Sequence, residues 1–369
     1  MASIVTPLAQ RLQKIIQTDG PISISKFMGI ALNDKDYGYY QTNEPFGVNG
    51  DFITSPEISQ VFGELIGLWF LSSWKIAGCP KETKLIELGP GRGTLMADIL
   101  RTVKKVESSF FKTAEIHLVE CSLSMRNRQE LALKDYDVTW HKNLESVPLG
   151  PSLIIANEFF DALPIDQYLL TNNGWHEKCI TFNNDKNIFE FTTVSVPNFD
   201  IAKFPSETFD SETNSVFERN RMSEKYAEAI GQRIASNGIA ALIIDYGYVN
   251  SGFGDTLQAV RDHKYQNPLF DIGRSDITAH VDFANIKKIL EGHSILVHGP
   301  VSQRKFLTDL GIEQRAMKLI ETASEKQSLF LIKGCQRLIA KNGMGSLFKV
   351  MSVTQKNVPI PEGFQLTNF

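Results

Sequence analysis

The sequence predicts an α/β fold built on a doubly wound, mostly parallel sheet with helices on both faces. Two observations predict it. Between about residues 84 and 156, short apolar segments alternate with amphipathic ones, as strands and helices do in a parallel sheet. The first apolar segment also ends in a glycine-rich turn that leads directly into a helical pattern. In chain order we expect strands at Lys84–Leu88, Glu115–Glu120, Val138–His141 and Ser152–Ala156, with helices at Thr94–Val106 and Ser124–Leu133.

The composition of the chain excludes several classes of protein. With 369 residues, 42% of them hydrophobic, the chain can bury a large core, which excludes disordered and disulfide-stapled classes. The balance of 38 basic and 42 acidic residues gives a net charge of −4, so nucleic acid is not an expected partner. The four cysteines form no C-x-x-C pair, so no metal or redox site is expected.

No targeting signal and no membrane span is expected from the sequence. The longest apolar stretch, Leu65–Trp74, has about half the roughly 20 residues that cross a bilayer, so no membrane insertion is expected. The first 20 residues resemble neither a signal peptide nor a transit peptide. We therefore expect a cytoplasmic protein, and the sequence leaves its oligomeric state open.

The remaining segments predict how the chain is organised around the sheet. Residues 1–80 are expected to form a helical extension that caps the ligand site, with Ser55 and Pro56 beginning its last helix, which ends before Cys79-Pro80. Residues 81–369 are expected to form the core, with a polar insertion at about 171–210. A helix is expected at Phe217–Ala235 and a buried strand at Ile239–Asp245, and the polar stretch at about 250–283 is too long for an idle connection, so it is a candidate substrate loop.

The most specific pattern is the run from Glu87 to Thr94, E-L-G-P-G-R-G-T, where a buried strand meets a helix. Glycines there permit positive φ and let backbone N–H groups approach a ligand at the positive end of the helix. A dinucleotide fingerprint would have Gly or Ala where Thr94 stands, and Glu87 would repel a pyrophosphate but suit a ligand that carries an ammonium group. The pattern matches motif I of the class I S-adenosylmethionine methyltransferases. The expected cofactor-binding residues of the turn are Glu87, Gly89, Gly91 and Gly93.

The next strands supply further candidates. The second strand ends in Glu120, an acid of the kind that accepts both hydroxyls of a ribose, at the spacing of a strand–helix–strand unit. The third strand brings Trp140, His141, Lys142 and Asn143 to where the adenine lies in this fold, although Trp140 would also suit core packing. The alternative for the whole arrangement is a plain strand-to-helix turn with an exposed Glu87.

The fourth strand ends in a chemically rich block, residues 157–164, N-E-F-F-D-A-L-P. A carboxamide, two carboxylates and two aromatic rings follow one another where class I methyltransferases place the groups that face the transferred methyl. The alternative is a capped turn, with Asn157 as the helix cap and both phenylalanines in the core.

Several blocks together resemble the MidA-type methyltransferases: Gly50–Ser59, Glu87–Gly93, Asn157–Pro164, Asp245–Gly247 and Asp276–Phe283. That family includes the mitochondrial complex I assembly factor that methylates arginine. The resemblance covers the chain from about Pro21 to Val350 and implies a class I, Rossmann-like fold with a substrate-binding lobe. It also implies an S-adenosylmethionine-dependent protein arginine N-methyltransferase, with S-adenosylhomocysteine as product. The implied reaction forms symmetric dimethylarginine on the 49-kDa-type subunit of NADH:ubiquinone oxidoreductase during complex I assembly.

Roles for individual residues follow from this chemistry. Arginine is protonated at neutral pH, and paired carboxylates can bind its guanidinium and accept the released proton. The expected catalytic residues are Glu158 and Asp161, with Asn157 beside them and Asp245 as the reserve carboxylate. The expected pocket walls are Phe159 and Phe160; the segment that closes the cofactor site contains Thr54, Ser55 and Glu57; and the substrate rim contains Asp262, His263, Asp276 and His280.

Other functions remain open at the level of sequence. A small-molecule O- or N-methyltransferase would share the cofactor turn and differ in the pocket. An assembly chaperone could keep the cofactor pocket for structure alone. A dinucleotide oxidoreductase is the third alternative.

Overall fold

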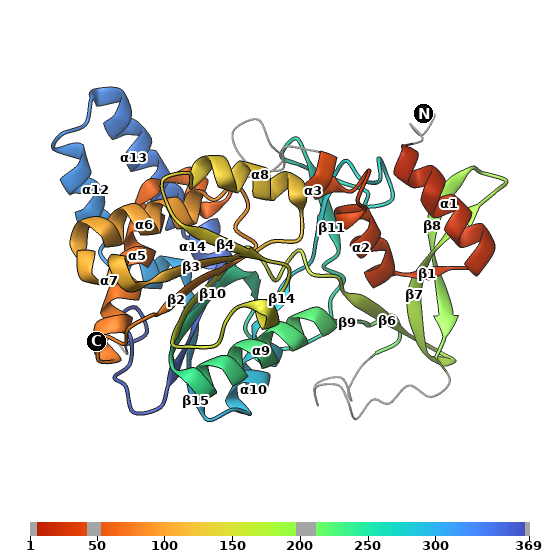
Figure 1. Cartoon of the computed structure of the whole chain (residues 1–369). Coiled ribbons are helices and arrows are strands. Elements are labelled where there is room, and N and C mark those ends of the chain that lie inside the picture. Colours follow the sequence, from red (N-terminus) through yellow and green to blue (C-terminus); the bar gives the residue numbers. More distant parts are fainter. Residues whose placement is uncertain (1–5, 43–52, 197–211, 366–369) are drawn as a thin grey trace. The chain divides into compact units, whose positions relative to one another are not determined.

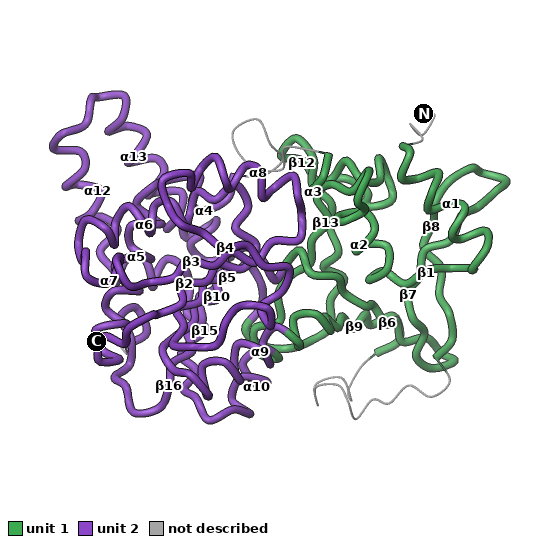
Figure 2. The backbone as a smooth tube through the Cα atoms, in the orientation of Figure 1, with its two compact units in different colours: residues 1–52, 161–225, 249–285 green, residues 53–160, 226–248, 286–369 purple. Residues whose placement is uncertain are grey.

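The computed structural model describes residues 6–42, 53–196 and 212–365, so Gly50, Asp51 and Phe52 of the family blocks and the end of the expected insertion lie outside the described residues. Figure 1 shows the elements in chain order. The chain divides into two compact units, coloured separately in Figure 2. Unit 1 contains residues 1–52, 161–225 and 249–285, and unit 2 contains residues 53–160, 226–248 and 286–369.

Unit 2 is built on a mixed sheet in the order β15-β16-β10-β5-β2-β3-β4. The strands from β10 to β4 are parallel, whereas β16 is antiparallel to β10 and β15 is antiparallel to β16. In Figure 1 the helices α5, α6 and α8 lie on one side of this sheet, and α9 and α10 lie on the other. The bounds are β2 Lys84–Leu88, β3 Glu115–Val119, β4 Val138–His141, β5 Ser152–Asn157, β10 Ile239–Tyr248, β15 Ile295–Ser302 and β16 Phe348–Gln355.

The helices of unit 2 bury their apolar faces against the sheet. Trp69 and Phe70 of α5 and Ile99 of α6 join strand residues such as Leu85 in one core cluster. Helices α5 and α6 meet at Gly63, where an added Cβ would lie 2.5 Å from the Cβ of Asp98, so the contact requires glycine. The bounds are α4 Ser55–Ile58, α5 Gln60–Ile76, α6 Thr94–Val106, α7 Ser108–Thr113, α8 Leu123–Ala132, a 3₁₀ turn Leu144–Ser146, α11 Gln303–Asp309, α12 Ile312–Ile320, α13 Glu325–Leu338 and α14 Met344–Leu347; α9 Arg221–Asn237 and α10 Phe283–Glu291 begin in unit 1.

Unit 1 combines helices with antiparallel strands. Strands β1, β7, β6 and β9 follow one another in a sheet in which β8 also pairs with β7, and β12, β11 and β13 form a second sheet. The core contains Leu8, Leu12, Phe27 and Ile180. The bounds are α1 Pro7–Asp19, β1 Ile22–Ser23, α2 Ile24–Asn33, α3 Tyr39–Thr42, β6 Asp166–Thr171, β7 Gly174–Asn183, β8 Ile188–Ser195, β9 Val216–Arg219, β11 Gln258–Arg261, β12 Lys264–Gln266, β13 Asp276–Thr278 and β14 Val281–Asp282.

The structure corrects two expected elements. The helix expected to begin at Ser55 is two helices, because Ser59 is extended (φ −159°, ψ 131°) and its side chain caps α5, while Thr54 is the N-cap residue of α4. The helix expected at Phe217–Ala235 begins at Arg221, because Phe217 lies in β9 and pairs with Tyr168.

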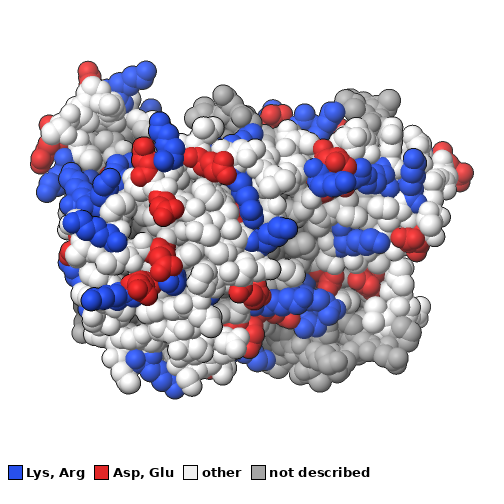
Figure 3. Space-filling view, viewed as in Figure 1, with Lys and Arg blue, Asp and Glu red and all other residues white. Residues whose placement is uncertain are grey.

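The first three helices cluster with segments from the middle of the chain, whereas the expected domain boundary lay at residue 80. Among the described residues, no helix combines the length and the apolar character that crossing a membrane requires. On the face shown in Figure 3, basic and acidic side chains are interspersed, in line with the small net charge.

Candidate active site

The glycine turn joins β2 to α6 in unit 2, as the sequence predicts. Gly89, Gly91 and Gly93 have φ of 62°, 51° and 83°, which side chains with a Cβ rarely adopt, and Gly93 is the N-cap residue of α6. The N–H of Gly89 donates to the carbonyl of Val119 (3.0 Å), which ties the turn to the end of β3. A Cβ on Gly89 would lie 2.7 Å from Cδ2 of Phe159. The turn therefore needs glycine both for its backbone conformation and for its close approach to the ring.

Glu87 is a buried carboxyl directly before the turn. Its side chain is 3% exposed, and it shares the sheet face of Leu85, toward α6. The backbone of Met96 hydrogen-bonds it, but Oε2 has no hydrogen-bond partner among the described residues. Burial raises the pKa of Glu87 to about 8. A buried oxygen without a partner suits a ligand that brings a donor, such as the ammonium group of S-adenosylmethionine.

Glu120 directly follows β3, and protein donors orient both of its carboxylate oxygens. Oε1 accepts the N–H of Ser122 (2.8 Å), and Oε2 accepts Nε2 of Gln129 (3.1 Å). Burial raises the pKa of this carboxyl. Gln129 also donates to the carbonyl of Gly91 (2.8 Å) and accepts from Nε1 of Trp140 (2.9 Å). The structure thus joins three of the predicted cofactor segments through a residue that the sequence reasoning missed.

Two of the other residues expected near the adenine, His141 and Asn143, have identifiable contacts. His141 lies at the end of β4, where its Nε2 is 3.0 Å from Nδ1 of His117, and burial lowers the pKa of both imidazoles, that of His117 to about 4. Asn143 caps the 3₁₀ turn through the N–H of Ser146 (3.0 Å).

Glu158 lies where β5 ends, in a left-handed backbone conformation (φ 51°) that is strained for a residue with a side chain. Its Oε1 accepts the N–H of Ser55 at the start of α4 (2.9 Å) and Nδ2 of Asn157 (3.2 Å). Oδ1 of Asn157 and the buried Oγ of Ser55 have no hydrogen-bond partner within the described part of the chain. Such strain persists where the surrounding structure enforces it, and it is common at active sites.

The segment that contains Thr54, Ser55 and Glu57 contacts both parts of the site. Besides the bond from Ser55 to Glu158, the carboxylate of Glu57 lies 3.6 Å from the guanidinium of Arg92 in the glycine turn. Unit 2 therefore places α4 against the turn and against the end of β5.

The two phenylalanines of the block have different environments. Phe160 is 1% exposed, so its ring is enclosed by protein. Phe159 is half-buried, and its ring centroid lies 5.5 Å from that of Phe160 and 4.8 Å from that of Tyr226, with the rings perpendicular. Of the two expected pocket walls, Phe159 is the more exposed, and contact of either ring with a substrate stays a prediction.

Asp245 is fully buried at the end of β10. Its Oδ2 accepts the N–H of Phe160 and its Oδ1 the N–H of Tyr246, both at 2.9 Å. Asp245, the reserve carboxylate of the sequence prediction, therefore holds the backbone of Phe160 just after β5.

The remaining candidates belong to unit 1, because the boundary between the units falls between Phe160 and Asp161. Asp276 accepts the hydroxyl of Tyr40 (3.1 Å). Burial raises the pKa of Tyr40 well above 10, and the charges of Asp276 and Asp161 add to the shift. The N–H of His280 donates to Oγ1 of Thr256 (2.9 Å).

Asp262 and His263 form a surface turn. Both have positive φ (50° and 60°), and they join β11 to β12 as the two-residue loop of a hairpin. The side chain of Asp262 is 84% exposed. Asp and His are among the residue types that adopt positive φ most readily, so the turn alone accounts for their presence here.

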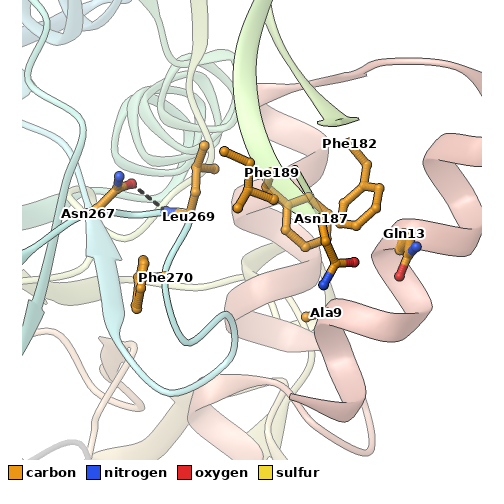
Figure 4. A pocket seen from close by; sticks show the side chains of 9 residues that line it. Ala9, Gln13, Phe182, Asn187, Phe189, Asn267, Leu269 and Phe270 are labelled. Carbon is orange, nitrogen blue, oxygen red and sulfur yellow. Dashed lines mark hydrogen bonds between the residues drawn. The ribbon is translucent and has the colours of Figure 1, made fainter. Parts of the chain in front are cut away.

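Each unit also has a pocket that the sequence did not predict. Figure 4 shows the one in unit 1, where Phe182, Phe189 and Phe270 line about 130 Å³ together with three carboxamide side chains. A larger groove of about 680 Å³ in unit 2 is lined by Glu57 and Thr94 beside the glycine turn and by residues of α12 and α13.

Comparisons with known proteins identify the family. Residues 65–301 match the model of a family described as putative S-adenosyl-L-methionine-dependent methyltransferases. The Danio rerio "Protein arginine methyltransferase NDUFAF7, mitochondrial" is 35% identical over 381 residues, which cover 95% of this chain and 88% of that protein. The Homo sapiens protein of the same name is 34% identical over 379 residues, which cover 95% and 83%. The chain belongs to this methyltransferase family.

A solved structure supports the fold of the methyltransferase. A COG1565 superfamily protein from Burkholderia thailandensis, crystallised bound to S-adenosyl-homocysteine, aligns with a TM-score of 0.81 over 97% of this chain and 92% of its own, at 24% identity. The predicted fold class, family and S-adenosylmethionine cofactor are confirmed. The residues of unit 2 fit this cofactor, since the glycine turn, the unpartnered oxygen of Glu87 and the oriented carboxylate of Glu120 adjoin one another.

Proposed function

We propose that this methyltransferase modifies arginine side chains of a protein. The further proposal is that it forms symmetric dimethylarginine on the 49-kDa-type subunit of NADH:ubiquinone oxidoreductase during complex I assembly. The observation that carries the proposal is the similarity along 95% of the chain to proteins named protein arginine methyltransferase. Glu158, whose backbone is strained, supports it, because its carboxylate accepts a hydrogen bond from the segment that contacts the cofactor turn.

The reaction sets a specific demand on the protein. S-adenosylmethionine, when bound, supplies an activated methyl group on a sulfonium centre. A guanidinium nitrogen must form a bond to the methyl carbon while the carbon–sulfur bond breaks, and one proton leaves that nitrogen. Guanidinium is protonated at neutral pH and is a poor nucleophile. A carboxylate close to it stabilises the cation, fixes its orientation and receives the proton.

We assign the binding and orienting of the guanidinium to Glu158. The N–H of Ser55 and the amide of Asn157 hold its carboxylate through Oε1, so the side chain is oriented before a substrate arrives. Phe159, which packs against Gly89, is the aromatic side chain we expect beside the reacting groups. A role for Asp161 as the second carboxylate stays a prediction. The proposed cytoplasmic location also stays a prediction, since the curated relatives are named mitochondrial.

The test separates binding from turnover. Glu158→Gln keeps the size of the side chain and an oxygen that accepts the N–H of Ser55, but it removes the charge. We expect S-adenosylhomocysteine to bind within about twofold of the parent, while methyl transfer to the purified 49-kDa-type subunit falls by about 100-fold or more. The matched control is Glu130→Gln, at an exposed position on α8, which should leave both quantities unchanged. Parent-like turnover of Glu158→Gln would refute the role of Glu158.

A further inference from the structure

Gln129 occupies a core position of α8. The buried residues of this helix are Met125 and Gln129, four positions apart, so both belong to the face that packs inward. A residue on such a face is normally apolar, and Gln129 is 0% exposed. Burying a carboxamide is unfavourable unless its polar atoms find partners, so the side chain must be held by its contacts.

The partners of Gln129 come from three separate segments. Both donated hydrogen bonds come from Nε2, one to the carbonyl of Gly91 in the glycine turn (2.8 Å) and one to Oε2 of Glu120 after β3 (3.1 Å). The accepted bond comes from Nε1 of Trp140 in β4 (2.9 Å). One amide group therefore uses two donors and one acceptor to join the turn, the acid and the aromatic residue.

The bond to Gly91 sets the orientation of the glycine turn. A trans peptide unit is planar, with its C=O and N–H pointing in opposite directions. Holding the carbonyl of Gly91 toward α8 therefore directs the N–H of Arg92 to the opposite side. Gly93 adds a close contact, since a Cβ on it would lie 3.4 Å from Cα of Gln129.

The bond to Glu120 sets the orientation of the acid. With Oε1 held by the N–H of Ser122 and Oε2 by Gln129, the plane of the carboxylate is defined. A carboxylate has about four acceptor positions, so these two bonds and the backbone hydrogen bond from Cys121 still leave acceptor capacity for a ligand hydroxyl.

We propose that Gln129 is a positioning residue for the cofactor, which holds the glycine turn and Glu120 in their binding geometry before S-adenosylmethionine arrives. This role concerns the cofactor and does not depend on arginine being the substrate. Preorganisation of this kind lowers the ordering cost of binding, so loss of Gln129 weakens the cofactor complex more than it weakens the fold.

The first experiment measures the binding of S-adenosylhomocysteine by calorimetry for the full chain. Gln129→Leu removes all three hydrogen bonds at similar volume, and we expect its dissociation constant to rise by about 10-fold or more. The matched control is Gln303→Leu. Gln303 is equally buried in unit 2, and it donates to the carbonyl of Leu338 at the end of α13 (2.9 Å). Because this hydrogen bond does not involve the glycine turn, its loss should change the affinity for S-adenosylhomocysteine by less than about twofold.

A second variant separates positioning from packing. Gln129→Glu keeps an acceptor for Trp140 but loses the donors to Gly91 and Glu120, and it brings a second carboxylate to Glu120. Relative to the parent at the same pH, we expect weaker binding at pH 8 that recovers toward pH 6, where the two carboxyl groups share a proton. Glu87, whose pKa burial raises to about 8, titrates in this range in both proteins, so the ratio of the two dissociation constants at each pH is the quantity compared. Arg126, which donates to the carbonyl of Glu120 (2.9 Å), is present in every variant, so it does not explain a difference in pH dependence between them.

The indole N–H of Trp140 gives a readout without ligand. Its NMR resonance should shift in Gln129→Leu, where the acceptor is lost, and stay hydrogen-bonded in Gln129→Glu. If both variants bind S-adenosylhomocysteine within about twofold of the parent at pH 8 and differ from the parent only in the free energy of unfolding, the proposal fails. If Gln129→Leu does not fold, Gln129→Glu decides on the same criteria. A parent protein that binds no S-adenosylhomocysteine would instead refute the cofactor site itself.

Discussion

The glycine turn predicts a large effect for Gly89→Ala. Gly89 has φ 62°, where a residue with a Cβ costs about 1–2 kcal/mol. The new Cβ would also lie 2.7 Å from Cδ2 of Phe159, and forcing a ring to move in a packed site costs about 1–3 kcal/mol. Together these terms predict a loss of about 2–5 kcal/mol in the free energy of unfolding of unit 2.

The assay is urea unfolding of the full chain, followed by a probe in unit 2. Gly78→Ala is the matched control, because Gly78 has φ 82° but nothing within 4 Å of an added Cβ, so it should cost only the backbone term. In a Phe159→Ala background the Gly89 substitution should also cost only that term, which a double-mutant cycle measures. Equal losses for Gly89→Ala and Gly78→Ala would refute the collision with Phe159.

Three further predictions follow from buried polar groups. Burial raises the pKa of Glu87 from 4.5 to about 8, so between these pH values only the unfolded state loses the proton. As pH rises through this window, the free energy of unfolding of the parent should fall by up to about 5 kcal/mol relative to that of Glu87→Gln. Parallel pH profiles of the urea midpoints of the two proteins would contradict this. Asp245→Ala leaves the N–H groups of Phe160 and Tyr246 without their acceptors and should lower the unfolding free energy by about 2–4 kcal/mol, whereas a change below 1 kcal/mol in thermal or urea unfolding would show that water replaces the carboxylate. Ser55→Ala should leave stability within about 0.5 kcal/mol, since its buried Oγ has no partner within the described residues, and a clear loss in the same assay would reveal one.

The sequence predicted the local features of the site well. The glycine turn, the strand before it and the acid after β3 depend on neighbours in the chain, and each lies where the pattern placed it. The hinge at Ser59 between α4 and α5 was missed because the apolar spacing runs through it without a break.

Features that depend on distant partners were not predictable. Gln129 meets Gly91 across 38 positions of the chain, and Asp245 meets Phe160 across 85. For Gln129, the one signal in the sequence was a polar residue four positions after Met125, on the same face of α8. For Asp245, a carboxylate at the end of an apolar strand indicates function and backbone capping equally well, and only the fold decides between them.

A protein arginine methyltransferase passes a methyl group from S-adenosylmethionine to arginine in a protein. The most direct test is incubation of the protein with methyl-labelled S-adenosylmethionine and host lysate, followed by mass spectrometry of the labelled proteins. We expect the label on guanidino nitrogens of arginine, as symmetric dimethylarginine in the 49-kDa-type subunit. Label on another residue type, or only in a small molecule, would contradict the claim.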